Sequence, residues 1–390
     1  MAKEGISYEG AFDQALRALL TSPWKTIAPD EVERSCDWLA GLRLPEIGLR
    51  VRNAPRAQHP RVVRGLALRA YAERFGDPRH GHELALRAVE VAEALPYAAE
   101  HMSLARDLQA GALGVLANSF RLLEDHQEAE ETWKRCEERR AGGTDDLHLG
   151  GELGRLKAAL RRDQRRYAEA IELQQGAACV LEGIAELHAA GKTWLSLAVT
   201  YFDAGDPGAA VEAASDAGRL LDCEREPELG FALLHNTLFF LEALKQPRLT
   251  TILLHKLEPL YAEAGSPIFV WRCWWLKGRL IAATGRHRPA AKHFDAARKA
   301  FVEHNLPYDA ALAGFDAAHA YSRLGQPLRV KHIAEQMFEV FTSKAIPVEA
   351  AAAFKIFVDA ALAWEADETL MARVAENLER VRFPGLEQRR

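Results

Sequence analysis

The sequence predicts an all-α fold, in which helix–turn–helix hairpins stack into an α-solenoid. Three observations support this prediction: apolar residues recur at helical spacing, a hairpin pattern recurs about every 40 residues, and the composition favours helices. Of the 390 residues, 48% are apolar and 27% are charged, and Ala and Leu dominate over the β-branched residues that favour strands. No run of alternating apolar and polar residues between turns predicts a sheet.

The segment from Trp194 to Ala217 shows one hairpin most clearly. Its first half carries four apolar residues spaced i, i+3, i+4 and i+7, which places them on one face of a helix. These residues are Trp194, Leu197, Ala198 and Tyr201. The run Gly205-Asp206-Pro207 then predicts a tight turn, because glycine adopts positive φ at a helix end and proline begins a helix without needing its N–H. A stripe of small residues follows, which lets a second helix approach the first closely.

The same hairpin recurs along the chain. The small residue after the turn, Ala210, has counterparts at a nearly constant step in sequence number on both sides. The counterparts are Ala129, Ala170, Thr250, Ala290, Val330 and Leu370. Because each hairpin has two apolar faces, it buries them only by stacking on neighbouring hairpins.

This pattern resembles the tetratricopeptide repeat over roughly residues 104–380. The usual unit of that family has about 34 residues, and here the unit is longer, with the extra residues between one hairpin and the next. Longer units of this kind resemble the sensor modules of some bacterial transcription activators and peptide-sensing regulators. The resemblance implies a right-handed superhelix whose first helices line a concave face that binds a protein or a peptide.

Residues 1–60 do not follow the repeat and are predicted to form an N-terminal helical cap, which shields the apolar face of the first stacked unit. An amphipathic helix is expected over residues 5–20, and a second helix is expected to begin at Pro29, because proline and acidic residues favour a first turn. The span 43–74 carries eight arginines against two acidic residues. A solvated cap face is the simpler interpretation, and contact with phosphate or an acidic partner is the alternative.

Residues 61–385 are predicted to form the superhelix, with about seven to eight units. In the first unit, 61–95, helices are expected over Val62–Phe75 and Glu83–Leu95, with Pro78–His82 lengthening the turn between them. The later units are expected over residues 104–140, 147–187, 191–224, 228–264, 267–305, 307–346 and 348–381. The last five residues, 386–390, are expected to be frayed.

The composition argues against several classes of protein. A formal net charge of −5 and a pI near 6.3 argue against a general nucleic-acid binder. The sequence has no run of 18 uninterrupted apolar residues that would span a membrane, and its first residues lack a signal-peptide core. Five scattered cysteines without a Cys-x-x-Cys motif predict reduced thiols in a cytoplasmic protein.

The resemblance implies that ligand-binding positions flank the packing residues of the first helices. Carried over unit by unit, these positions give Asn118, Arg121, Lys192, Phe202, His235, Phe239, Arg272, Trp275, Arg279, Phe315, His319 and Arg323. Rigid aromatic surface beside arginine is typical of binding hot spots, and arginine offers two donors to a carboxylate. This predicts a groove for an extended or helical peptide that carries acidic groups and apolar anchors. The alternative is that the aromatic residues pack in the core.

No motif in the sequence indicates catalysis or a cofactor, since phosphate-binding loops, dinucleotide-binding glycines and nucleophile elbows are all missing. His80 and His82 lack a third ligand at the spacing of a metal site. The favoured function is therefore a non-catalytic interaction scaffold. The alternatives are a sensor module of a bacterial signalling or transcription system that responds to a peptide or effector and, more remotely, a helical repeat that binds RNA. The oligomeric state stays open.

Overall fold

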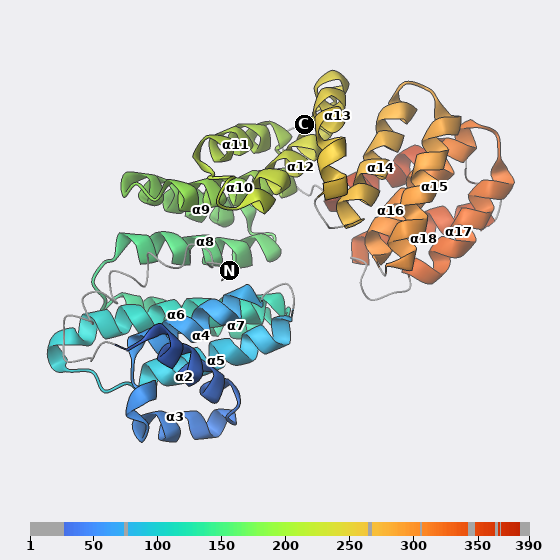
Figure 1. The fold of residues 1–390 in the computed structure, drawn as a ribbon. Helices are drawn as coiled ribbons and strands as arrows, with labels where there is room; N and C mark the ends of the chain where they lie inside the picture. Colours follow the sequence, from blue (N-terminus) through green and yellow to red (C-terminus); the bar gives the residue numbers. More distant parts are fainter. Residues whose placement is uncertain are drawn as a thin grey trace. The chain divides into compact units, whose positions relative to one another are not determined.

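The computed structural model describes residues 27–73, 77–263, 267–304, 306–341, 348–362, 366 and 368–382. Within these ranges every regular element is a helix (Figure 1), which confirms the predicted all-α fold. No helix in the described part of the chain has both the length and the apolar character needed to cross a bilayer. The helix expected over residues 5–20 and the tail 386–390 lie outside the described residues.

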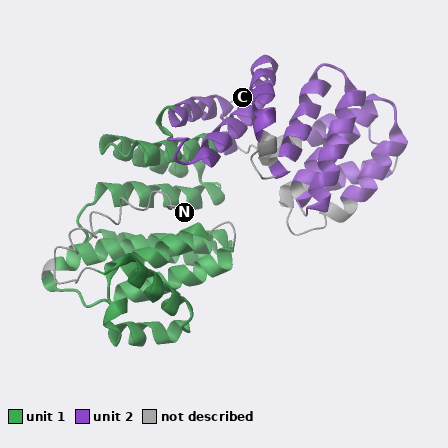
Figure 2. Cartoon of the chain, in the orientation of Figure 1, with its two compact units in different colours: residues 1–200, 219–221 green, residues 201–218, 222–390 purple. Residues whose placement is uncertain are grey.

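The chain divides into two compact units (Figure 2). Unit 1 comprises residues 1–200 with 219–221, and unit 2 comprises residues 201–218 and 222–390. The helices whose residues lie mainly in unit 1 are α2 (Pro29–Ala40), α3 (Leu44–Arg52), η1 (Pro55–Ala57), α4 (Pro60–Ala72), α5 (Pro78–Ala94), η2 (Ala99–His101), α6 (Met102–Leu122), α7 (His126–Arg140), α8 (Leu147–Asp163), α9 (Tyr167–Gly183) and α10 (Leu187–Asp203).

Unit 2 contains the later hairpins. Its helices are α11 (Pro207–Leu220, mainly in this unit), α12 (Pro227–Ala243), α13 (Pro247–Glu263), α14 (Pro267–Ala283), α15 (His287–Glu303), α16 (Pro307–Arg323), α17 (Pro327–Phe341), α18 (Val348–Leu362) and α19 (Glu368–Arg382).

The observed starts of two helices near the N-terminus can be compared with the predicted ones. The helix expected at Pro29 begins there as α2, with the proline in its first turn. The lengthened turn expected over Pro78–His82 is wrong, because α5 begins at Pro78 itself. The Asp77 side chain accepts a hydrogen bond of 3.0 Å from the backbone N–H of His80 and caps this helix. Proline here starts a helix rather than extending a turn.

The regular repeat is confirmed by the helix boundaries. The expectation that its extra residues lie between one hairpin and the next is wrong, because α9 ends at Gly183 and α10 begins at Leu187, so the helices themselves are longer. The first helices of five consecutive hairpins begin at 147, 187, 227, 267 and 307, and the second helices begin at 167, 207, 247, 287 and 327. Residues one repeat apart therefore occupy equivalent places on equivalent helices.

The hairpin turns from α6–α7 to α16–α17 each contain a residue in the left-handed region of backbone space. These residues are Glu124, Arg165, Gly205, Lys245, Gly285 and Gly325, with φ between 54° and 82°. The next backbone N–H reaches back to the helix that has just ended: Asp206 donates to the Tyr201 carbonyl at 2.8 Å, and Gln326 donates to the Tyr321 carbonyl at 3.0 Å. Such bonds satisfy carbonyl groups that a helix end would otherwise leave without a partner. Glycine occupies three of the six positions, and the other three bear side chains at an energetic cost.

The small residues after the turns are buried inside the repeats. Ala129, Ala170, Ala210, Thr250 and Ala290 are fully buried, as the sequence register predicts. Large aromatic side chains also pack in the cores: Trp133 lies in the core of unit 1, and Phe301 and Phe357 lie in the core of unit 2.

Candidate functional site

The first helices α12, α14 and α16 carry most of the residues predicted to bind a partner. All three lie in unit 2 and begin at the same point of the repeat. Two sets of predicted residues recur along them, one member on each helix. We call His235, Trp275 and Phe315 the buried row, and Phe239, Arg279 and His319 the open row, because the first three are buried and the second three are partly exposed.

The buried row belongs to the core. The Trp275 indole N–H donates to Asp316 Oδ2 at 2.7 Å, and its ring lies edge-on to Phe301. Phe315 packs edge-on against Phe357, with ring centroids 5.3 Å apart. For Trp275 and Phe315 the structure therefore agrees with the alternative that these aromatic residues pack inside the unit.

His235 is buried between two phenylalanines of the same helix, Phe231 and Phe239. Burial lowers the pKa of its imidazole to about 3, and the positive charge of Arg272 acts in the same direction. In the open row, burial also lowers the pKa of His319; Asp316 opposes this shift, and Arg323 and His287 add to it. Both histidines are therefore mainly neutral near pH 7, and the positive charges of this surface come from arginine.

Two arginines of α14 connect it to both neighbouring first helices. Arg279 Nη2 lies 3.0 Å from Glu242 Oε1 on α12, and Arg272 Nη2 lies 3.3 Å from Asp309 Oδ2 on α16. The two arginines are two helical turns apart, which places them on one face of α14, about 10 Å apart along its axis. Their side chains are 26% and 34% exposed, so solvent reaches both guanidinium groups while carboxylates hold them in place.

The remaining predicted residues of unit 2 lie near this surface or at its ends. Phe202, at the end of α10, is partly exposed and packs on Phe240 at a centroid distance of 4.8 Å. Arg323 is exposed at the end of α16.

Three of the predicted residues lie in unit 1. Asn118 is buried, and its Oδ1 accepts a hydrogen bond of 3.0 Å from Arg121 Nε. Arg121 Nη1 then contacts Asp163 Oδ2 at 2.5 Å, which joins α6 to α8. Lys192 is partly exposed on α10. The structure thus brings Asn118 and Arg121 together, in a different unit from the arginines of α14.

The sequence reading missed a charged cluster on α8. Glu152 is fully buried and lies 2.8 Å from Arg155, whose Nη2 also donates to the Tyr71 hydroxyl at 3.3 Å. The repeat register could have identified Glu152 as a candidate, because it lies one repeat before Lys192 and three repeats before Arg272. It therefore occupies the same place in its hairpin as two residues that were predicted.

Comparison with protein-family models finds no match, and comparison with curated proteins finds none. Solved structures with a similar fold include two Rap proteins. A Rap protein complexed with Competence and Sporulation Factor has a TM-score of 0.61 and 14% identity, over 83% of this chain and 88% of that one. The apo form of RapI has a TM-score of 0.57 and 12% identity, over 82% of this chain and 86% of that one.

At these identities the likeness concerns the fold alone. It agrees with the hairpins of this chain, in which two helices joined by a short turn recur at a constant interval. The chain therefore has the fold of the tetratricopeptide-like helical repeat proteins.

Proposed function

We propose that this protein is a non-catalytic scaffold that binds a peptide, or an exposed segment of a partner protein, on the first helices of unit 2. The observation that carries the proposal is the placement of Arg272 and Arg279 on one face of α14. Each is partly exposed and each is oriented by a carboxylate of a neighbouring first helix. The fold likeness supports the proposal, because one of the similar structures is a complex with a separate factor.

The spacing of the two arginines defines the ligand. Two turns of helix span about 10 Å, and a peptide in the extended polyproline II conformation, with about 3.1 Å rise per residue and about three residues per turn, covers that distance in about three residues. Such a peptide lying along α14 would therefore present acidic side chains at positions i and i+3 on one side, towards the two arginines. Each arginine can bind a partner carboxylate because the planar guanidinium carries five N–H donors and pairs with a carboxylate through two of them.

Phe239 supplies the apolar contact that such a peptide needs. It is partly exposed in the open row and packs against His235 at a centroid distance of 5.1 Å. Because burial and Arg272 keep His235 neutral, the surface beside Phe239 is suited to an aliphatic side chain rather than to another charge.

The test is direct binding of synthetic peptides to the full chain, measured by fluorescence anisotropy. The probe carries glutamates at positions i and i+3 with leucines beside them, and the matched peptide has glutamine in place of both glutamates. We expect the acidic peptide to bind at least about tenfold more tightly, a difference of about 1.4 kcal/mol.

Arg272→Ala and Arg279→Ala should each remove most of this preference. Arg288→Ala is the matched control, because Arg288 is an exposed arginine on α15, the second helix of the same hairpin. Equal binding of the two peptides, or equal losses in all three variants, would refute the proposed role of α14.

A further inference from the structure

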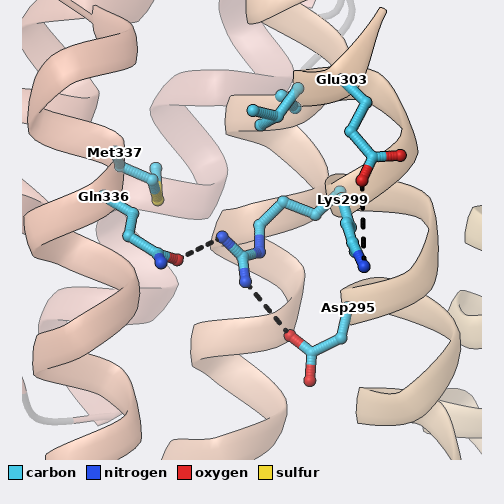
Figure 3. A pocket seen from close by; sticks show the side chains of 8 residues that line it. Asp295, Lys299, Glu303, Gln336 and Met337 are labelled. Carbon is cyan, nitrogen blue, oxygen red and sulfur yellow. Dashed lines mark hydrogen bonds and ion pairs between the residues drawn. The ribbon is translucent and has the colours of Figure 1, made fainter.

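A cavity of about 550 Å³ lies in unit 2, away from the open row. It is formed by the second helices α15 and α17, with Ala310 of α16 contributing to its wall. Figure 3 shows Gln336 and Met337 on one side of this cavity and Asp295, Lys299 and Glu303 on the other. Its volume falls in the range of small-molecule sites.

The guanidinium of Arg298 is the main charged group in this cavity. Its side chain is only 18% exposed. Among the described residues its one hydrogen bond runs from Nη1 to Gln336 Oε1, at 2.6 Å, and its Nε is buried without a hydrogen-bond partner. Among the described residues a neutral amide is thus the hydrogen-bond partner of this cation, and Asp295 forms an ion pair with it at 3.6 Å.

The two nearby carboxylates form their closest contacts with groups other than Arg298. Asp295 Oδ1 is 3.6 Å from Arg298 Nη2, beyond the usual range of a hydrogen bond, and Asp295 Oδ2 accepts the Tyr321 hydroxyl at 2.5 Å. Glu303 is 3.8 Å from Lys299 on the exposed rim. The two cations and two acids of the lining cancel in formal charge. Arg298 nevertheless has N–H groups without an acceptor, which can donate to an anion that enters.

The rest of the wall is apolar. Val302 is 52% exposed at the cavity, and Met337 and Ala310 are buried behind it. Gly314 gives Arg298 and Met337 their space, because a Cβ there would lie 3.1 Å from Arg298 Cδ and 3.1 Å from Met337 Sδ. A flexible methionine beside an exposed valine accommodates aliphatic groups of varied shape.

We propose that this cavity binds a small ligand with one carboxylate and a short aliphatic chain. The carboxylate pairs with Arg298 and the chain lies against Val302 and Met337. Two sources share this chemistry: a free aliphatic acid, and the C-terminal residue of a peptide. A charge-assisted bond to a partly desolvated arginine gives the site its specificity for the ionised acid.

The ligands for the test are hexanoate, which represents the free acid, and N-acetyl-leucine, which represents a peptide C-terminus. Hexanamide and N-acetyl-leucinamide are their neutral counterparts. Binding to the full chain is measured by saturation-transfer NMR and by calorimetry. We expect at least one acid to bind about tenfold or more tightly than its amide.

Arg298→Gln should abolish that preference. Val302→Trp should block the cavity while leaving Arg298 in place, and so it tests the site even if Arg298→Gln fails to fold. Lys292→Ala is the control, because Lys292 is exposed on α15 and does not line the cavity.

Binding of both acids supports a general carboxylate site, and binding of one acid identifies the source. The proposal is overturned if neither acid binds, if the amides bind equally well, or if binding of the acids survives both Arg298→Gln and Val302→Trp.

Discussion

Arg279 on α14 lies 3.0 Å from Glu242 on α12, so one ion pair joins the first helices of two consecutive hairpins. The side chains are 26% and 18% exposed, which leaves the pair open enough for a third charged group to compete. Glu242 thus orients Arg279. Under the proposed function, Glu242 also competes with the carboxylate of the bound peptide for Arg279.

Glu242→Gln should therefore increase affinity for the acidic peptide severalfold. The amide still accepts a hydrogen bond from Arg279 but no longer neutralises it. Because the pair is partly solvated, the expected loss of stability is about 1 kcal/mol or less. Anisotropy titrations and denaturant unfolding measure the two effects. If Glu242→Gln bound the acidic peptide more weakly while its stability was unchanged, Glu242 would not compete with the peptide for Arg279.

The turns allow a paired test of backbone strain. Lys245 and Gly285 occupy equivalent turns, with φ of 54° and 77°. A left-handed conformation costs a residue with a side chain about 1 kcal/mol or more relative to glycine. Gly285→Ala should therefore destabilise unit 2 by about 1 kcal/mol, and Lys245→Gly should stabilise it by up to a similar amount. Hydrogen exchange of the flanking helices measures the stability change of each variant. If the two variants changed stability in the same direction, the turn conformation would not be the cause.

The architecture was predictable because repetition averages over weak local signals. No single alanine defines an interface, but Ala129, Ala170, Ala210 and Ala290 recur in register, and each is fully buried. A local sequence pattern that occurs only once in the chain led to a wrong prediction. The sequence pattern predicts a turn at Pro78, but Asp77 and Pro78 together form a capped helix start.

The binding surface was predictable only in part. The register identified candidate positions on the first helices, and it could not say which of them face solvent. Trp275 and Phe239 are both aromatic, but Trp275 is buried because Asp316 and Phe301, from the following helices, close around it. Such contacts join residues on different helices and leave no periodic trace in the sequence.

His235 predicts a pH dependence of stability. Its pKa is about 3 in the folded chain, through burial and then Arg272, against an ordinary value of 6.5. Between these two values the unfolded chain binds a proton that the folded chain does not. Stability should therefore fall as the pH drops from 6.5 towards 3, by up to about 1.4 kcal/mol per pH unit, and this contribution should not change above pH 6.5.

The measurement is the free energy of unfolding at pH 7 and pH 5.5, for the native sequence and for His235→Phe. Phenylalanine suits the site because Phe231 and Phe239 flank it. The variant should lose less stability on acidification than the native sequence. An identical loss in both proteins would assign the acid sensitivity to other groups.

The five cysteines should separate into two classes of reactivity. Burial raises the pKa of Cys36 and Cys273 to about 11 and that of Cys136 to about 12, so these thiols form little of the reactive thiolate. Cys179 and Cys223 are exposed. Brief maleimide treatment at pH 7 should therefore modify Cys179 and Cys223 in the folded protein, and all five after denaturation. Intact-mass and peptide analysis would show rapid labelling of Cys136 if its environment were open.

Because the first helices start at a constant interval, the chain can change in length by whole hairpins. Pro227, Pro267 and Pro307 each begin a first helix at the same point of the repeat. Removing residues 227–266 would join Glu226 directly to Pro267 and leave the alternation of long helix and short connection intact. Whole hairpins can therefore be gained or lost by duplication or deletion of a gene segment. Each such event would alter the number of contact positions offered to a partner while the distance between them stayed the same.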